Sequence, residues 1–122
     1  MAHNELGPHN TIFHGEHLVG FIDWDDAAPG TRVRDLANAV YNYVDVSQWS
    51  NQEANEQARL ILLMGAAYGW HDPLASVNDF EADLQQALRN HEQAGRVDGI
   101  AIFAQEVTWM RQRTHELRRL LR

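Results

Sequence analysis

The hydrophobic period of this chain changes once, at Pro29-Gly30, and this change limits the folds that the chain can adopt. Before it, two short apolar runs, residues 11–14 and 18–22, flank a turn candidate at residues 15–17 and indicate a β-hairpin. After it, apolar residues recur at helical spacing to the end of the chain. The sequence therefore predicts an α+β fold that is mainly α, with a short β-hairpin followed by about four helices.

Residues that typically cap or end helices set the expected limits of the helices. Thr31 can cap the first helix, Ser50 opens a capping-box sequence, and glycines can end the second and third helices. An Asp-Pro step before the third helix indicates a loop. The predicted helices span residues 31–44, 50–69, 78–95 and 99–122. No repeat or linker divides the chain, so we expect one domain, residues 1–122, with a loop and hairpin segment, 1–30, and a helical region, 31–122.

Composition narrows the possible partners and the cellular compartment. The formal charge of -7 argues against nucleic acid and anionic membranes, because both favour a basic surface. Cysteine is absent, which excludes disulfides and thiolate metal sites and fits a cytoplasmic protein. No apolar run approaches the ~20 residues needed to span a bilayer, and the N-terminus lacks an export signal. We therefore expect a cytoplasmic protein that binds neither nucleic acid nor membrane.

Three polar side chains near the N-terminus form a candidate site. Glu5 and Asn10 lie on one loop bent by Gly7-Pro8, and the returning strand of the hairpin can bring Asp23 beside them. Two carboxylates and an amide are the minimum set for holding a divalent metal ion and activating a hydroxyl group. The sequence therefore predicts metal-dependent chemistry on a hydroxyl group at this loop.

Four motifs in this region resemble, in their order and spacing, the catalytic segment of a known family. The motifs are His3-x-Glu5-x-x-x-x-Asn10, Ile22-Asp23-Trp24, Pro29-Gly30 and Arg34-Asp35-Leu36-Ala37. Together they resemble the aminoglycoside phosphotransferase and choline-kinase-like family, whose members are relatives of the protein kinases. The resemblance is specific over residues 3–37, and it implies the protein-kinase-like C-terminal lobe of a small-molecule kinase.

The resemblance implies a role for each matching residue. Glu5 would orient the acceptor hydroxyl in catalysis, and His3 would orient the same catalytic loop. Asn10 would bind a magnesium ion, and Asp23 would bridge magnesium to the phosphates of ATP. Asp35 would brace the catalytic loop. The implied cofactors are therefore Mg²⁺ and ATP, and the implied substrate is a small hydroxylated metabolite or an aminoglycoside-like molecule.

Two features depart from the family pattern. Glu5 stands where the family has aspartate, which moves the carboxylate outward by one methylene group. The chain also contains no lysine and no glycine-rich phosphate loop, so the phosphate-pairing lysine would have to come from a missing N-terminal lobe. We therefore expect the isolated chain to be inactive. The alternative is a non-catalytic, truncated homologue that acts as an oligomeric or binding module.

Apolar residues in the last predicted helix alternate at spacings of three and four from Ile100 to Leu121. This stripe favours packing on the same domain, but it also fits a dimer seam. Large exposed apolar patches usually find partners, so we expect a homodimer, formed through this helix or through the face that an N-terminal lobe would cover.

Histidines near the loop raise a second possibility, a zinc site. The potential ligands are His3, Glu5, His9, His14 and His17. Their spacing matches no zinc-protease motif, so the sequence favours a loop-orienting role for His3 and solvent exposure for the histidines of the turn.

Overall fold

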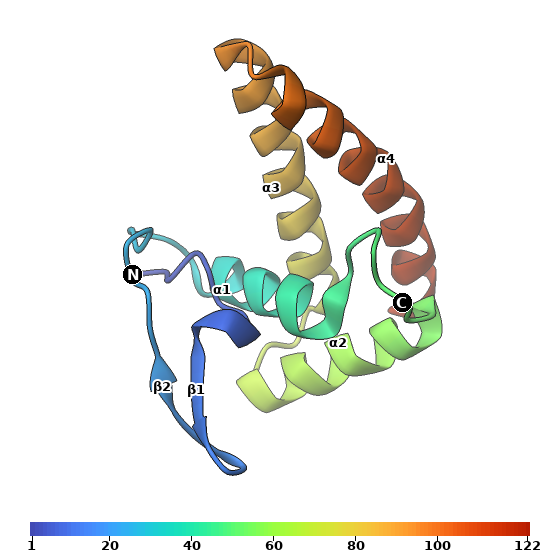
Figure 1. Ribbon diagram of the computed structural model, residues 1–122. Coiled ribbons are helices and arrows are strands. Elements are labelled where there is room, and N and C mark those ends of the chain that lie inside the picture. The colour runs from blue at the N-terminus through green and yellow to red at the C-terminus, as the bar shows by residue number, and fades with distance from the viewer.

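The computed structural model describes residues 1–122 and contains one antiparallel hairpin and four α-helices (Figure 1). The elements follow in the order η1 (Pro8–Asn10), β1 (Thr11–His14), β2 (His17–Phe21), α1 (Arg32–Ala39), η2 (Val40–Asp45), α2 (Ala54–Tyr68), α3 (Pro73–Ala94) and α4 (Val97–Leu120). η1 is a 3₁₀ turn, and η2 is a π-helical turn that continues α1. The predicted α+β fold, a hairpin followed by four helices, is confirmed.

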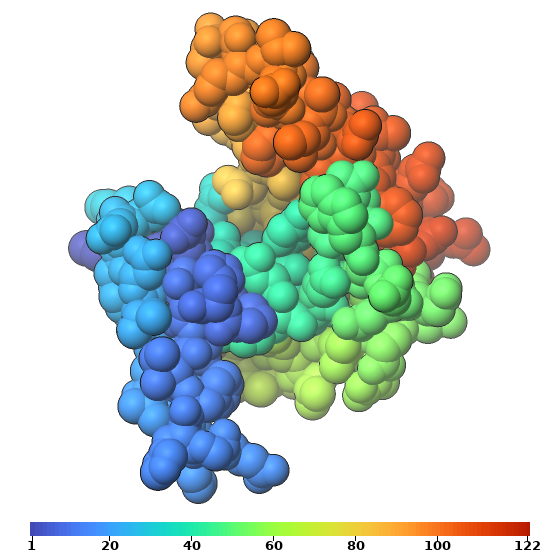
Figure 2. Space-filling view, viewed as in Figure 1, coloured from blue at the N-terminus to red at the C-terminus, as the bar shows by residue number.

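The hairpin forms where the two short apolar runs of the sequence predict it. Gly15 adopts a φ of +62° at the first position of the two-residue turn, which is the position that favours glycine in a type II′ turn. A bulge between Ile12 and Phe13 leaves Val19 as an extra residue in β2. The hairpin extends away from the helices and forms a separate projection in Figure 2.

The helices pack around a core to which the hairpin contributes nothing. α3 and α4 are joined at Gly95 and pack against each other along much of their length, while α1 packs on α3 and α2 on α4 (Figure 1). The core residues are Leu36, Ala37, Val40, Val44, Val46, Ala58, Ile61, Val77, Phe80, Met110, Leu117 and Leu121. No helix is long and apolar enough to cross a lipid bilayer.

The apolar stripe of α4 faces the chain's own core. Val107, Met110, Thr114 and Leu117 are buried, and Met110 and Leu117 have no exposed surface. From Val107 to Leu117 the stripe therefore packs within the same domain, as the first alternative predicts.

Two predicted helix starts are wrong for local reasons. α3 begins at Pro73 rather than near residue 78, because Asp72 caps it by accepting hydrogen bonds from the backbone N–H groups of Leu74 and Ala75. α2 begins at Ala54 without a capping box. Ser50 instead accepts from the backbone N–H of Gln52, so the chain turns before the helix starts.

Two other details also differ from the prediction. The first helix is α-helical only to Ala39, and its last expected apolar position, Val44, lies in η2. The apolar run of residues 60–64 favours a substantially buried second helix, but Leu62 and Leu63 in α2 are 48% and 59% exposed.

Candidate functional site

His3 anchors the loop that precedes the hairpin, and only 1% of its surface is exposed. Its Nδ1 accepts a hydrogen bond from the backbone N–H of Glu5 at 3.2 Å. The ring proton therefore lies on Nε2, which donates to the carbonyl of Ile22 at 2.8 Å. The ring also packs on Trp24, with 4.4 Å between ring centroids. Both ring nitrogens are thus used within the site, where His3 fixes the loop to the end of β2.

Asp35, in the first turn of α1, holds the same loop from the helical side. Its Oδ1 accepts hydrogen bonds from the backbone N–H groups of His3 and Asn4, at 2.8 and 3.3 Å. Asn4 has a φ of +69°, and its side chain donates to the carbonyl of Asp26 at 2.8 Å. A left-handed backbone is costly for a residue other than glycine, so it persists only where its surroundings hold it. Here the bonds to Asp35 and Asp26 do so.

Ile22 brings Asn10 and Asp23 together. Its backbone N–H donates to the carbonyl of Asn10 at 3.0 Å, and Asp23 is the next residue in the chain. Asn10 is buried, and its Nδ2 donates to the carbonyl of Glu5 at 3.0 Å, while its amide oxygen forms no hydrogen bond in the chain. Asp23 is exposed, has a φ of +59° and forms no ion pair. Both residues therefore have side-chain oxygens that could bind a hard cation.

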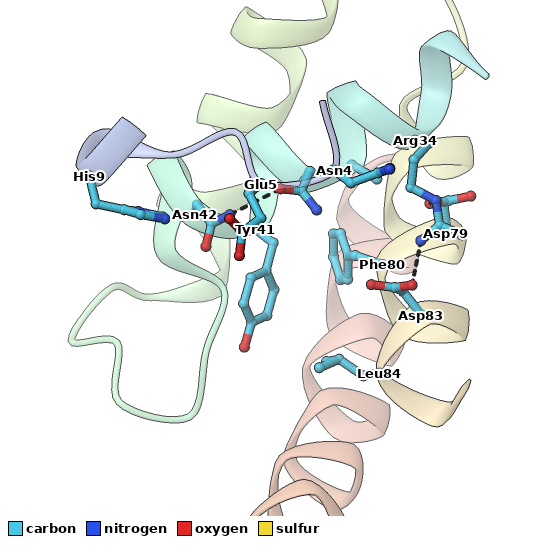
Figure 3. A pocket seen from close by; sticks show the side chains of 12 residues that line it. Asn4, Glu5, His9, Arg34, Tyr41, Asn42, Asp79, Phe80, Asp83 and Leu84 are labelled. Atoms are coloured by element: carbon cyan, nitrogen blue, oxygen red, sulfur yellow. Dashed lines mark hydrogen bonds and ion pairs between the residues drawn. The ribbon is translucent and has the colours of Figure 1, made fainter. Parts of the chain in front are cut away.

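Glu5 lines a cavity of about 270 Å³ between the loop, α1, η2 and α3 (Figure 3). Two further carboxylates, those of Asp79 and Asp83, reach the cavity from α3, and the guanidinium of Arg34 lies beside them. The three carboxylates outnumber this one guanidinium. The cavity therefore favours a positively charged ligand.

Arg34 neutralises the two carboxylates of α3 only in part. Its guanidinium forms a hydrogen-bonded ion pair with Asp83, and its Nε lies 3.4 Å from Oδ2 of Asp79. Burial raises the pKa of the Asp79 carboxyl, Arg34 lowers it by a smaller amount, and Asp83 raises it further. Oδ2 of Asp79 is buried and accepts no hydrogen bond.

Tyr41 forms a further part of the cavity wall, and Figure 3 shows its ring pointing away from the loop. Its hydroxyl donates to Oε1 of Glu106 in α4 at 2.7 Å, and the Glu106 side chain is buried. Burial and the nearby Glu106 carboxylate raise the pKa of the Tyr41 hydroxyl, so it remains a hydrogen-bond donor. α4 thereby fixes this wall of the cavity without lining it.

The sequence model of the phosphotransferase enzyme family, APH, matches residues 1–74, which is more than half of the chain. The chain belongs to the phosphotransferase enzyme family. The match confirms the resemblance carried by the N-terminal motifs. No curated protein and no solved structure matches the chain. Kinases of the phosphotransferase family generally use ATP and Mg²⁺.

The phosphotransferase match includes only part of the cavity. It covers the loop, the hairpin, α1, η2 and α2, and it ends in the first turn of α3. Glu5, Asn10 and Asp23 thus lie inside the matched region, whereas Asp79 and Asp83 lie outside it. Two of the three carboxylates that favour a cation in the cavity therefore lie beyond the family match.

The amides and acids that face the phosphotransferase loop were not predicted from the sequence. Asn38 and Asn42 follow helical spacing on one face, and Asn42 donates from Nδ2 to the carbonyl of Leu6 at 2.7 Å. Asp79 and Asp83 repeat the same spacing on α3. These patterns are visible in the sequence, but no pattern indicates that these two helix faces meet at the loop.

The histidines of this phosphotransferase-family chain do not gather into a zinc site. Both ring nitrogens of His3 are occupied, His9 lines the cavity, and His14 pairs with His17 at the tip of the hairpin. No group of three or more histidine, aspartate or glutamate side chains is placed to hold a metal ion. The geometry does not support the zinc alternative.

Proposed function

We propose that this chain forms the acceptor-binding and catalytic-loop part of a kinase that transfers a phosphoryl group from ATP to a hydroxyl group. The supporting observation is that hydrogen bonds from the loop to Ile22 join both halves of such a site. Glu5 lines the acidic cavity, and Asn10 and Asp23 present unused oxygens where the same loop meets the hairpin.

Glu5 would orient the acceptor hydroxyl and accept its proton. Its backbone is fixed on both sides, by His3 at the N–H and by Asn10 at the carbonyl, while its carboxylate forms no hydrogen bond in the chain. A carboxylate held in this way suits general-base catalysis in phosphoryl transfer. Position matters strongly here, because a displacement of about 1 Å can cost roughly 100-fold in rate. The glutamate side chain is one methylene group longer than the aspartate of the family pattern. The acceptor hydroxyl would therefore have to bind at a correspondingly different position.

Asn10 and Asp23 would hold Mg²⁺. Magnesium takes oxygen ligands and is usually bound through one or two carboxylates together with substrate phosphates, and a free amide oxygen beside an exposed carboxylate fits this pattern. When bound, magnesium and ATP would supply the phosphoryl group. No lysine occurs in the sequence, so the phosphate-pairing lysine of kinases would come from outside these residues, and we expect the isolated chain to be inactive.

The cavity beside Glu5 would bind the acceptor. Its excess of carboxylates favours a molecule with an ammonium group as well as a hydroxyl group. Its volume of about 270 Å³ lies below the range of roughly 300–1,000 Å³ that is usual for ligand pockets. We therefore propose a small amine-bearing alcohol, or one ring of an aminoglycoside-like molecule.

The alternative is a non-catalytic homologue that acts as an oligomeric or binding module. The observation that favours it is the exposed apolar surface of the hairpin, where Phe13, Leu18 and Val19 are 53–65% exposed. This surface and the Glu5 site do not exclude each other.

Calorimetric titration of the chain with ATP and Mg²⁺ tests the proposed half-site. The proposal predicts a Kd below about 1 mM, because two side-chain oxygens are free to bind the metal ion. Asp23→Asn should abolish the binding, and Asp98→Asn, an exposed change at the start of α4, should leave it unchanged. If the wild-type chain gives no heat, or if Asp23→Asn binds as well as the wild type, the half-site does not exist.

A further inference from the structure

The hairpin carries apolar side chains on both faces. On one face, Phe13, Leu18 and Phe21 line a second cavity of about 480 Å³ between the hairpin, α1 and α2. The other face carries Ile12 and Val19, which do not line this cavity and are 43% and 65% exposed. An antiparallel sheet that packs on one side only has one apolar face and one polar face. Because both faces of this hairpin are apolar, we expect each face to be covered by other apolar side chains.

The second cavity is almost free of unused polar groups. The hydroxyl of Thr11 bonds to Tyr43, and Oδ1 of Asp35 accepts hydrogen bonds from the loop. The remaining wall is formed largely by apolar and aromatic side chains, with Met64 and Tyr68 contributed by α2. Such a wall recognises apolar shape rather than a charged or strongly polar ligand.

The exposed apolar area of the hairpin and of the residues that follow it is large enough to contribute most of a stable interface. Phe13, Phe21 and Trp24 are 55%, 38% and 52% exposed, so at about 150–250 Å² per aromatic side chain they leave roughly 200–350 Å² uncovered. Ile12, Leu18, Val19 and Ile22 are also 43–65% exposed and add an area of the same order. The sum reaches the largest patches on monomers, about 300–600 Å², and approaches the roughly 800 Å² that each partner buries in a standard interface.

We propose that two copies of this chain associate through their hairpins in a twofold dimer. The outer-face side chains Ile12 and Val19 of each copy would pack into the apolar cavity of the other, so that both faces of each hairpin are covered. A projecting apolar arm and an apolar cavity on the same chain are self-complementary, as an isologous interface requires. The apolar stripe of α4 is buried within the chain from Val107 onward, which leaves less of it available for this role.

The uncharged patch is compatible with a contact between two copies of the chain. The seven hairpin side chains of the patch are uncharged, so their contact brings no like charges directly together. The overall charge of -7 opposes binding to polyanions. Moreover, neither strand contains proline or lysine, residues that commonly protect the edges of exposed sheets. The inference goes beyond the proposed function, because it involves neither the nucleotide nor the acceptor.

Light scattering after gel filtration at tens of micromolar tests the proposal. The wild type should show about twice the chain mass of 14.0 kDa. Val19→Asp should dissociate the dimer, with a Kd for dissociation at least about tenfold higher, because it places a carboxylate in an apolar contact. Val97→Asp is the matched control, since Val97 is 75% exposed and begins α4, whose first turns lie far from the hairpin (Figure 1). Circular dichroism checks that both variants fold.

Three outcomes would overturn the dimer. The first is a wild-type monomer at these concentrations, including one whose cavity binds a small apolar dye. The second is a Val19→Asp variant that remains as dimeric as Val97→Asp. The third is equal dissociation of both variants. None of these outcomes depends on ATP or Mg²⁺, so they are separate from a failure of the proposed function.

Discussion

His3 and Ile22 are joined by a hydrogen bond of 2.8 Å from the imidazole Nε2 to the backbone carbonyl, and this bond connects the two parts of the candidate site. His3 lies at the start of the loop that carries Glu5. Ile22 precedes Asp23, and its backbone N–H bonds to Asn10. One buried ring therefore sets the spacing between the residue that lines the acidic cavity and the residues that could bind a metal ion.

His3→Ala is expected to lower the free energy of unfolding by about 2–4 kcal/mol, because it removes buried hydrogen bonds and leaves a void beside Trp24. Urea denaturation measures the change. His17→Ala, at the exposed tip of the hairpin, should change this free energy by less than about 0.5 kcal/mol. Similar losses in the two variants would mean that the loop does not depend on His3.

Gly30→Ala should destabilise the N-terminal segment. A Cβ at residue 30 would lie 2.7 Å from the Cβ of Ala2, so Ala2 and its paired hydrogen bonds with Ala28 would have to shift. Overpacking of this kind typically costs about 1–3 kcal/mol, which thermal or urea unfolding can resolve. Gly20→Ala is the matched control, because a Cβ there meets no atom within 4 Å.

A double variant tests whether the cost of Gly30→Ala arises at Ala2. Ala2→Gly removes the atom that the new Cβ would meet, so adding it to Gly30→Ala should recover much of the lost stability. Purely additive effects of the two changes would show that another contact is responsible.

Local chemistry explains which parts of the fold could be predicted from the sequence. The Gly15 turn, the Thr31 cap and the helix ends at Gly69 and Gly95 all form where predicted. Each depends on residues within a few positions in the chain, either on a left-handed glycine or on one short side-chain bond. Such local preferences do not depend on contacts with distant parts of the chain.

The rest depends on contacts between distant segments. Gln52 donates from its side chain to the carbonyl of Val44, so the segment expected to begin α2 packs against η2 instead. The cavity likewise needs Asp79 and Asp83 of α3 to face Glu5, which follows from how α1 packs on α3. Motif order could therefore identify Glu5, Asn10 and Asp23 as candidates, but not the acidic wall opposite Glu5.

Asp79→Asn should change how stability depends on pH. The pKa of Asp79 is raised by folding, so the native state binds its proton more tightly than the unfolded state does. Its contribution to stability therefore falls as the pH rises from about 3.9, the ordinary pKa of aspartate, through the raised native value. The stability of Asp79→Asn relative to the wild type should increase across this interval. Urea denaturation at several pH values measures the difference, and a constant difference or one of opposite sign would contradict it.

The raised pKa of the Asp79 carboxyl also predicts that protons are released when a cation binds. A ligand ammonium beside Asp79 would favour its charged form, so the bound state would give up protons at a pH near the raised pKa. Calorimetry of 2-deoxystreptamine, a ring with two amines and several hydroxyl groups, in buffers of different ionisation enthalpy detects this release. Asp79→Asn should remove the buffer dependence. Binding heats that are the same in all buffers for the wild type would rule out this coupling.

Substitutions of Glu5 can separate its effect on ligand binding from its effect on stability. Only its backbone takes part in the hydrogen bonds of the loop, so Glu5→Gln should change the free energy of unfolding by less than about 0.5 kcal/mol. The same change removes one of the carboxylates that line the cavity, and we expect about tenfold weaker binding of 2-deoxystreptamine by calorimetry. Glu5→Asp keeps the charge and should bind nearly as well as the wild type. Loss of stability with unchanged binding in Glu5→Gln would instead make Glu5 a structural residue of the loop.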